Sequence, residues 1–318
     1  MWVWRGKKRG GVFVSPRARL GAGRDRLLSM NRYALLLSLC LLPCPSFGQT
    51  APADATPGLA ATDVIPHGAV HRESYTTKFV KGLDGDQGTF LVYTPPGYDA
   101  AKKLGYPVLY LLHGWGGNAD AWIKTGKADL MYERLLASGK AKPMVIVMPL
   151  GYGDMTFLSN GFEVWRDQAQ ISNNVNLFAE TLLKEIMPQV QTHYDVATDR
   201  EHTAIAGLSM GGLESLTIGL RHPELFASIG GFSSAMFPVA GQDLTKLDPK
   251  KENLKLLWVA CGTDDDLLSV NRIFEMHLRD EGLPVTVVET PGKHAWGVWK
   301  NNFRVFVPLL FQDDTAKR

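Results

Sequence analysis

Residues 203–212, with the sequence TAIAGLSMGG, are the most informative segment of this 318-residue chain. The apolar run Thr203–Ala206 predicts a buried strand, and the segment Leu213–Arg221 behind it predicts a helix. Between them, a G-x-S-x-G motif places Ser209 in a strand-to-helix turn so tight that the positions flanking the serine require glycine. A serine exposed in this way at the end of a strand is typical of a nucleophile, so Ser209 is the first candidate for a catalytic residue.

Short apolar runs and helical patterns alternate along the rest of the chain from about residue 70. Further strands are predicted at Thr89–Tyr93, Val108–Leu112, Met144–Met148, Leu256–Ala260 and Val285–Val288. Apolar residues recur at three- and four-residue steps from Val175 to Val190, which predicts a helix, and a second such pattern extends from Trp299 to Leu310. This alternation predicts an α/β fold with a mostly parallel central sheet and helices on both faces.

A glycine-rich loop follows the strand predicted at Val108–Leu112. Its sequence, HGWGG (residues 113–117), matches the H-G-x-G-G loop that provides a backbone N–H to the developing oxyanion in α/β-hydrolases. The second N–H comes from the residue after the nucleophile, here Met210. His113 precedes the glycines, which favours a structural role for this histidine, holding the loop by hydrogen bonds, over a role as the catalytic base.

In α/β-hydrolases the acid and then the histidine follow the serine in the chain. His222 lies where a helix is expected to end, and His277 lies inside a predicted helix. His294, in contrast, lies in a loop after a predicted strand, where a catalytic histidine belongs. The acid is expected just after the strand predicted at Leu256–Ala260, and on spacing alone it can be any of Asp264, Asp265 and Asp266. Its task is to hold the tautomer of the histidine and to stabilise the imidazolium.

The first 48 residues are strongly basic, with nine Lys and Arg against one acidic residue, a charge of +8. The apolar run Tyr33–Leu42 and the small residues before Gln49 fit a secretory signal peptide cleaved near Gly48-Gln49. A signal that starts at Met30 is already complete, so residues 1–29 are interpreted as an upstream extension. A nucleic-acid-binding arm and a lipoprotein anchored at Cys44 are the disfavoured alternatives. Residues 49–70 are expected to be a flexible lead-in, and residues 71–318 a single catalytic domain.

Removal of such a signal would change the charge of the chain. The whole sequence has 34 basic and 32 acidic residues, a net charge of +2, whereas residues 49–318 keep 25 basic and 31 acidic residues, a charge of −6. This balance offers no electrostatic basis for binding nucleic acid. No apolar run reaches the roughly 18 residues needed to cross a bilayer, so no stable membrane association is expected. Cys261 alone would remain, so no internal disulfide is expected, and this cysteine is predicted to be a small buried residue.

Together these motifs resemble the esterase D-like group of carbohydrate esterase family 1, in the α/β-hydrolase superfamily, which includes bacterial feruloyl esterases and acetylxylan esterases. The resemblance covers about residues 72–312 and is carried by residues 113–117, 207–212, 262–265 and 292–300. The family pattern G-T-x-D implies that Asp265 is the acid. The family's other oxyanion donor, besides the residue after the nucleophile, matches the backbone of Trp115, and Trp299 matches the tryptophan of its H-x-x-x-x-W pattern.

The resemblance implies a secreted or periplasmic serine esterase that uses Ser209, Asp265 and His294 and needs no metal or cofactor. Feruloyl esters of plant cell-wall polysaccharides are the first substrate expected, with release of hydroxycinnamic acids and a place in xylan degradation. Aromatic side chains in nearby loops, namely Tyr152, Trp165 and Trp296 together with Trp299, are candidates for binding a phenolic acyl group or a sugar ring. For each of them a purely structural role is equally open.

Several alternatives stay open. The first is an acetylxylan esterase or another carbohydrate or siderophore acyl esterase. An S-formylglutathione hydrolase is disfavoured by the signal segment, and a mycolyltransferase would need a site that excludes water. A non-catalytic carbohydrate-binding relative would require an incomplete triad, whereas the set found here is complete. The sequence makes no prediction about the oligomeric state.

Overall fold

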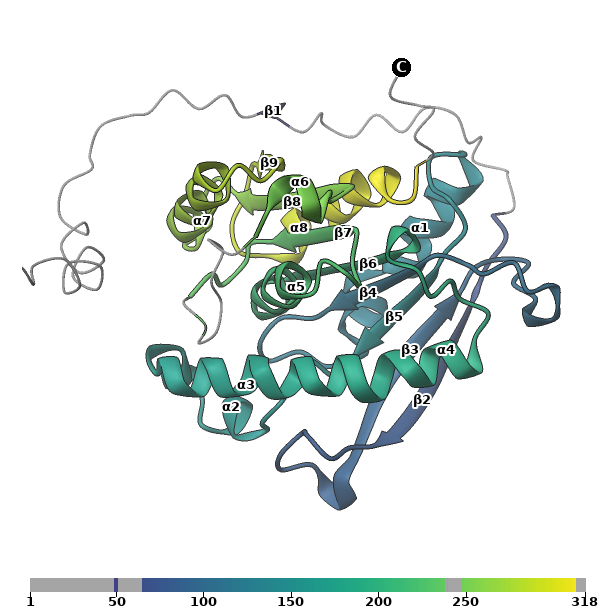
Figure 1. The fold of residues 1–318 in the computed structure, drawn as a ribbon, viewed down its shortest axis with the longest axis horizontal. Helices are drawn as coiled ribbons and strands as arrows, with labels where there is room; N and C mark the ends of the chain where they lie inside the picture. The colour runs from purple at the N-terminus through teal and green to yellow at the C-terminus, as the bar shows by residue number, and fades with distance from the viewer. Residues whose placement is uncertain (1–48, 51–64, 238, 240–246, 313–318) are drawn as a thin grey trace, which may run out of the picture. The chain divides into compact units, whose positions relative to one another are not determined.

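A single mostly parallel sheet forms the centre of the molecule (Figure 1). The computed structural model describes residues 49–50, 65–237, 239 and 247–312. Its strands are β1 (Gln49–Thr50), β2 (Ala69–Thr76), β3 (Gln87–Thr94), β4 (Val108–Leu112), β5 (Val145–Pro149), β6 (Thr203–Leu208), β7 (Ser228–Phe232), β8 (Leu256–Gly262) and β9 (Val285–Thr290). Their order across the sheet is β1-β9-β8-β7-β6-β4-β5-β3-β2. Only the pairs β2–β3 and β3–β5 are antiparallel among the described strands, so the predicted sheet is confirmed.

Helices cover both faces of this sheet, as the sequence predicts. One face carries α3 (Gln168–Thr181), α4 (Met187–His193), α5 (Met210–Arg221) and α7 (Leu268–Asp280). The other face carries α1 (Ala128–Ala137) and α8 (Trp296–Phe306). Two short helices, α2 (Thr156–Ser159) and α6 (Pro249–Glu252), lie in connecting segments. The helices that cover the two faces bury apolar side chains against the sheet, which is what holds the layers together.

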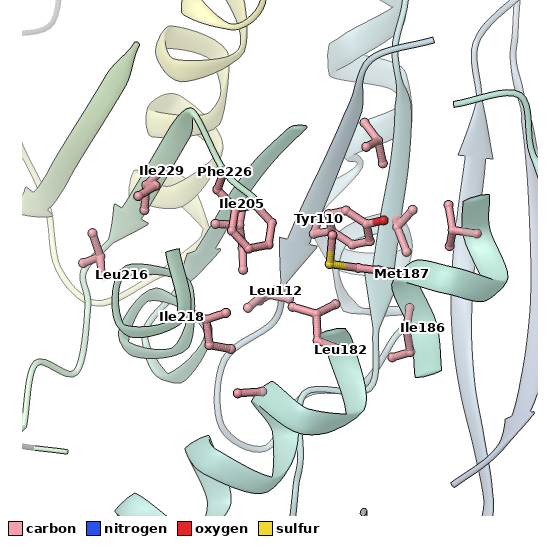
Figure 2. Close-up of a cluster of buried hydrophobic side chains, with 14 of the residues drawn as sticks. Tyr110, Leu112, Leu182, Ile186, Met187, Ile205, Leu216, Ile218, Phe226 and Ile229 are labelled. Carbon is pink, nitrogen blue, oxygen red and sulfur yellow. The ribbon is translucent and has the colours of Figure 1, made fainter. Parts of the chain in front are cut away.

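Successive side chains of each central strand belong to two different cores, because they point to opposite faces of the sheet. Tyr110 and Leu112 of β4 belong to the core under α3, α4 and α5, where Figure 2 shows them close to Leu182. Leu109 and Leu111 belong to the core under α1 and α8. Burial on both faces explains why the central strands read as continuous apolar runs.

The helical pattern from Val175 to Val190 corresponds to one long helical segment. α3 passes through a wider π-helical turn at Leu182–Ile186 directly into α4 (Figure 1). Pro188, in the first turn of α4, has no N–H to continue the hydrogen-bond ladder, and its ring would crowd the carbonyl four residues earlier. The wider turn accommodates the proline without ending the helix.

Three of the described strands, β1, β2 and β7, have no clear signal in the sequence. β1 has only two residues and pairs with β9, inside the segment 49–70 that is expected to be a flexible lead-in. Among the described strands β2 pairs with β3 alone, and most of its side chains are exposed, so its sequence AVHRESYT lacks an apolar run. β7 contains Gly230 and Gly231, which weaken the strand pattern. A Cβ atom on Gly230 would lie 2.7 Å from the ring of Phe306, so the close approach of α8 requires glycine there. β2 begins at Ala69, within the last two residues of the expected lead-in, and the boundaries proposed at residues 48 and 70 stay predictions.

The parallel strands β4, β6, β8 and β9 all end at the same edge of the sheet. The loops that follow them carry His113–Gly117, Ser209, Asp265 and His294, so the topology gathers the predicted site residues at one edge. None of the described helices is both long and apolar enough to cross a membrane. The predicted signal segment lies outside the described residues.

Candidate active site

Ser209 lies between the end of β6 and the first residue of α5, with a backbone conformation of φ 53° and ψ −112°. This region is strained for a residue with a side chain, and such strain is concentrated at functional sites. A Cβ atom on Gly207 would lie 2.4 Å from the carbonyl oxygen of Gly211, and one on Gly211 would lie 2.5 Å from the carbonyl oxygen of His113. Both glycines are therefore required by close backbone approach, as the G-x-S-x-G motif predicts.

His294 lies between Ser209 and Asp265. Its Nε2 atom is 3.0 Å from the Ser209 hydroxyl oxygen, and its Nδ1 atom is 2.9 Å from Oδ2 of Asp265. The imidazole of His294 also packs edge-on against Trp299, with ring centroids 4.9 Å apart. These contacts fix the ring on three sides, so the structure brings together the three residues that the sequence predicts as a triad.

The three consecutive aspartates differ sharply in their surroundings. The side chain of Asp265 is completely buried, and its Oδ1 atom accepts the Leu267 N–H at 2.8 Å. Asp264 and Asp266 are exposed. Burial alone would raise the pKa of Asp265, but the hydrogen bonds from His294 and from the Leu267 N–H favour the carboxylate, and its pKa is lowered. Asp265 is therefore the aspartate placed to hold His294.

The HGWGG loop lies directly against the serine turn. A Cβ atom on Gly114 would lie 2.6 Å from Cδ1 of Leu208 and 3.2 Å from Cβ of Ser209, so only glycine fits there. The backbone N–H of Met210 begins helix α5, where the first amides have no partner within the helix. Among the described residues, neither this N–H nor that of Trp115 donates a hydrogen bond to the protein. Both predicted oxyanion donors are therefore free to bind an oxygen.

His113 is fully buried beneath this loop, and its two ring nitrogens bond backbone groups of Gly114 and Gly151 rather than Ser209. Its Nδ1 atom lies 2.8 Å from the carbonyl oxygen of Gly114, and its Nε2 atom accepts the N–H of Gly151 at 2.9 Å. Burial lowers the pKa of His113 to about 4, so the ring is neutral, with its proton on Nδ1. The geometry matches the structural role predicted for this histidine.

A cleft of about 530 Å³ opens beside Ser209 and His294. It is lined by the glycine-rich loop and by three tryptophans, Trp115, Trp296 and Trp299. The indole of Trp115 donates to the carbonyl oxygen of Phe157 at 2.9 Å and contacts the exposed ring of Phe162 edge-on. The cleft therefore combines a reactive serine with aromatic walls.

Two residues expected to bind substrate lie elsewhere. Tyr152 is completely buried, and its hydroxyl accepts the N–H of Gly116 at 2.7 Å, so it supports the glycine-rich loop from below. Trp165 packs between Phe157 and Phe237 and is absent from the lining of the cleft. The reason is the same for both: the segment from residue 150 to 166 folds back into a small apolar core and presents few of its aromatic rings to the cleft.

Sequence reasoning missed two buried polar residues under the glycine-rich loop, Glu214 and Asn174. Glu214 lies on α5 and Asn174 on α3, and a single polar residue in a helical pattern gives no signal of its burial. Cys261 is buried, and its pKa is raised to about 12, first by burial and then by the charge of Asp265. Among the described residues, no group of three or more His, Cys, Asp and Glu side chains is arranged to bind a metal ion.

Comparison with known proteins identifies relatives along most of this chain. The family model Esterase, described as "Putative esterase", matches residues 83–310. The chain is 31% identical over 253 residues to an endo-1,4-beta-xylanase/feruloyl esterase of Xylanibacter ruminicola, a match that covers 78% of this chain and 32% of that protein. The chain thus spans about a third of the length of this relative. An acetyl esterase of Caldicellulosiruptor saccharolyticus is 26% identical over 226 residues, which cover 60% of this chain and 78% of the relative.

Solved structures agree with the sequence relatives. A ferulic acid esterase superimposes with a TM-score of 0.64 at 27% identity, over 76% of this chain and 96% of that structure. This likeness confirms the α/β-hydrolase fold predicted from the serine turn. Together with the family model and the xylanase/feruloyl esterase relative, it also confirms the resemblance to the esterase D-like group of carbohydrate esterase family 1. The chain therefore belongs to this esterase family, whose members are α/β-hydrolases.

Proposed function

We propose that the chain is a serine carboxylic-ester hydrolase that releases hydroxycinnamic acids, ferulic acid first, from esters of plant cell-wall polysaccharides. The observation that carries the proposal is the position of His294, with one ring nitrogen 3.0 Å from the Ser209 hydroxyl and the other 2.9 Å from the Asp265 carboxylate. This arrangement has the geometry of a serine, a general base and an acid that orients the base.

The proposed reaction is acyl transfer from the ester to water. His294 accepts the proton of Ser209 on Nε2 while the serine oxygen attacks the ester carbonyl carbon. The backbone N–H groups of Trp115 and Met210 stabilise the resulting oxyanion. The intermediate collapses to an acyl-serine as His294 protonates the departing sugar alcohol. Water, deprotonated by His294, then attacks the acyl-serine and releases the carboxylic acid.

Asp265 keeps the proton of His294 on Nδ1 during this cycle and stabilises the imidazolium as it forms. Support comes from its completely buried side chain and from its lowered pKa, which keeps the carboxylate ionised. The edge-on contact with Trp299 restrains the same ring, so we assign Trp299 to positioning the base as well as to the cleft wall.

The aromatic lining of the cleft supports a phenolic acyl group. Trp115, Trp296 and Trp299 surround the space next to Ser209, and flat aromatic rings pack favourably on such walls. Xylanase/feruloyl esterase and ferulic acid esterase are the names carried by the relatives described above, which points in the same direction.

An acetyl esterase is the second candidate, because the Caldicellulosiruptor relative carries that name and most of its length is covered. A panel of methyl ferulate, naphthyl acetate and acetylated xylan separates the two. We expect kcat/KM for methyl ferulate to exceed that for naphthyl acetate. Equal or higher values on the acetyl esters would replace feruloyl by acetyl ester hydrolysis as the function.

We further propose that the enzyme is exported to the periplasm or the medium after cleavage near Gly48-Gln49. The proposal depends on the basic and apolar pattern of residues 1–48. No stable membrane association, no metal or cofactor, and no nucleic-acid partner form part of it.

A further inference from the structure

We propose that Glu214 is a positioning residue for the oxyanion hole: with Asn174 it clamps the segment Gly151–Asp154, and this segment holds the glycine-rich loop His113–Gly117. The inference rests on the proposed function, because it assigns Trp115 of that loop as an oxyanion donor. It adds a group that is remote from the reacting atoms and acts only through the backbone of the loop.

Glu214 is completely buried, one to two turns after Ser209 along α5. Its Oε1 atom accepts a hydrogen bond from Nδ2 of Asn174 on α3, at 3.3 Å. Its Oε2 atom has no hydrogen-bond partner among the described residues. A carboxyl group is costly in such a place, because an apolar residue of similar volume would avoid the desolvation penalty. A carboxyl group retained at this cost is expected to have a task, and the groups around it indicate which one.

The carboxyl group and Asn174 hold the segment Gly151–Asp154 from two sides. Oδ1 of Asn174 accepts the N–H groups of Gly153 at 3.0 Å and of Asp154 at 3.2 Å. A Cβ atom on Gly151 would lie 3.1 Å from Oε2 of Glu214, so the carboxyl group lies against the backbone of that glycine. Asn174 uses its donor on Glu214 and its acceptor on the segment, so the three parts form one connected unit.

The same segment then ties down the glycine-rich loop on both sides of Trp115. The N–H of Gly151 donates to Nε2 of His113, and Nδ1 of His113 bonds the carbonyl oxygen of Gly114. On the other side, the Tyr152 hydroxyl accepts the N–H of Gly116 at 2.7 Å. A shift of residues 151–152 would therefore move the peptide of Trp115, and catalysis by an oxyanion hole is sensitive to such shifts.

The uncharged acid is the form that fits this site. Desolvation raises the pKa of Glu214 well above its usual range, and the hydrogen bond from Asn174 opposes this only in part. The titratable groups that face the carboxyl group are His113 from the glycine-rich loop and Tyr152 from the clamped segment, and neither supplies a positive charge: the pKa of His113 is lowered to about 4, and that of Tyr152 is raised. The nearby Asp154 carboxylate is directed to Thr156 and Asn173. Ionisation of Glu214 would leave an unpaired negative charge in the clamp.

The test compares Glu214→Gln and Glu214→Leu with the wild-type enzyme on a simple ester. Glutamine has the shape and the hydrogen-bonding groups of a neutral carboxyl, so kcat should stay within about threefold of wild type. Leucine cannot bond Asn174, so kcat should fall by about 10- to 100-fold with KM within about twofold, a part of the loss seen when an oxyanion donor is removed. Ile218→Val, a buried change on the same helix, is the control: it should lower Tm and leave kcat unchanged.

Hydrogen exchange of the backbone amides provides a readout that does not depend on activity. Glu214→Leu should speed exchange in residues 113–117 and 150–154, whereas Ile218→Val should not. If the wild-type enzyme hydrolyses no ester, the proposed function fails, and the exchange data still test the clamp. An unchanged kcat or unchanged exchange in Glu214→Leu would overturn the positioning role, and so would a Glu214→Gln variant as impaired as Glu214→Leu.

Discussion

At the scale of single residues, the site depends on groups that have the same chemistry but different surroundings. Asp265 differs from Asp264 and Asp266 only in position, yet it alone is buried against His294. His113 and His294 both lie near the serine turn, yet one is locked as a neutral support and the other bridges Ser209 and Asp265. Burial and hydrogen-bond partners, rather than residue type, assign these roles.

Asp265→Asn should lower kcat by about 10³- to 10⁴-fold, because an amide can hold His294 in the wrong tautomer and cannot stabilise the imidazolium. Asp264→Asn is the matched control, since the side chain of this neighbour is exposed, while its backbone N–H donates to the carbonyl oxygen of Gly292. Its kcat should remain near that of the wild type. Steady-state kinetics of both purified variants provide the measurement. A larger loss of kcat in Asp264→Asn than in Asp265→Asn would mean that Asp265 is not the acid.

His113 should make the protein less stable in mild acid. Its pKa is lowered from 6.5 to about 4 in the folded state, so between these values the unfolded chain binds a proton that the folded protein does not. Stability therefore falls as the pH decreases through this window, by about 2 kcal/mol between pH 8 and pH 5, and is independent of His113 above it.

His113→Gln keeps an acceptor for the Gly151 N–H but does not titrate. The decrease in the free energy of unfolding between pH 8 and pH 5, measured by urea denaturation, should then be smaller by about 2 kcal/mol. His277→Gln, an exposed histidine on α7, should leave that decrease as it is in the wild type. An equal decrease in His113→Gln would mean that His113 is not the source of the acid sensitivity.

The sequence predicts Ser209 and His294 because a motif and a loop position mark them, and the family pattern adds Asp265. Tyr152 was expected to face the substrate because an aromatic residue in a loop gives the same signal whether it is buried or exposed. Glu214 and Asn174 were missed because one buried polar residue on a helix is indistinguishable from an exposed one until the neighbouring helix is placed.

At the scale of elements, two glycines differ in the space around them. One lies at the end of β6, just before the turn into α5, and the other lies at the start of α8. Gly207 is confined by the backbone of Gly211, whereas a Cβ atom on Gly297, inside α8, would meet nothing within 4 Å. The strands with continuous apolar runs were predicted from sequence, but β7 was not, because the glycines that let α8 approach it also weaken its strand signal.

Substitution of these two glycines by alanine should change stability in opposite directions. Gly207→Ala forces a methyl group against a carbonyl oxygen and should lower the free energy of unfolding by about 2–3 kcal/mol. Glycine disfavours helix formation more than any residue except proline, and a methyl group at position 297 would meet no neighbour among the described residues. Gly297→Ala should therefore raise the free energy of unfolding by about 0.5–1 kcal/mol. Chemical denaturation measures both values, and a stabilised Gly207→Ala variant would show that the turn is not as tight as described.

At the scale of the whole molecule, the net charge of +2 is the sum of two unlike parts. Residues 1–48 carry +8 and residues 49–318 carry −6. The part of the chain that contains the site, residues 49–318, is therefore acidic, and only the full sequence is close to neutral. Export would separate the two parts, which makes the proposed cleavage measurable by charge.

The exported protein should begin at or near Gln49 and focus at an acidic pH. N-terminal sequencing and isoelectric focusing of protein recovered from the periplasm or the medium check both features. The full sequence has a pI of about 8.3, so a mature protein that focuses above pH 8 would mean that the basic segment is retained.

Ser209→Ala provides the most direct test of the central claim that Ser209 is the nucleophile of a feruloyl esterase. The measurement is the initial rate of methyl ferulate hydrolysis by the variant and the wild type, with Tm as a check on folding. Ser215→Ala is the control, since it removes another hydroxyl of α5, one that bonds to the carbonyl oxygen of Gly230. We predict a loss of at least about 10⁴-fold in Ser209→Ala and near wild-type rates in Ser215→Ala. A folded Ser209→Ala variant that hydrolyses methyl ferulate at the wild-type rate would contradict the account.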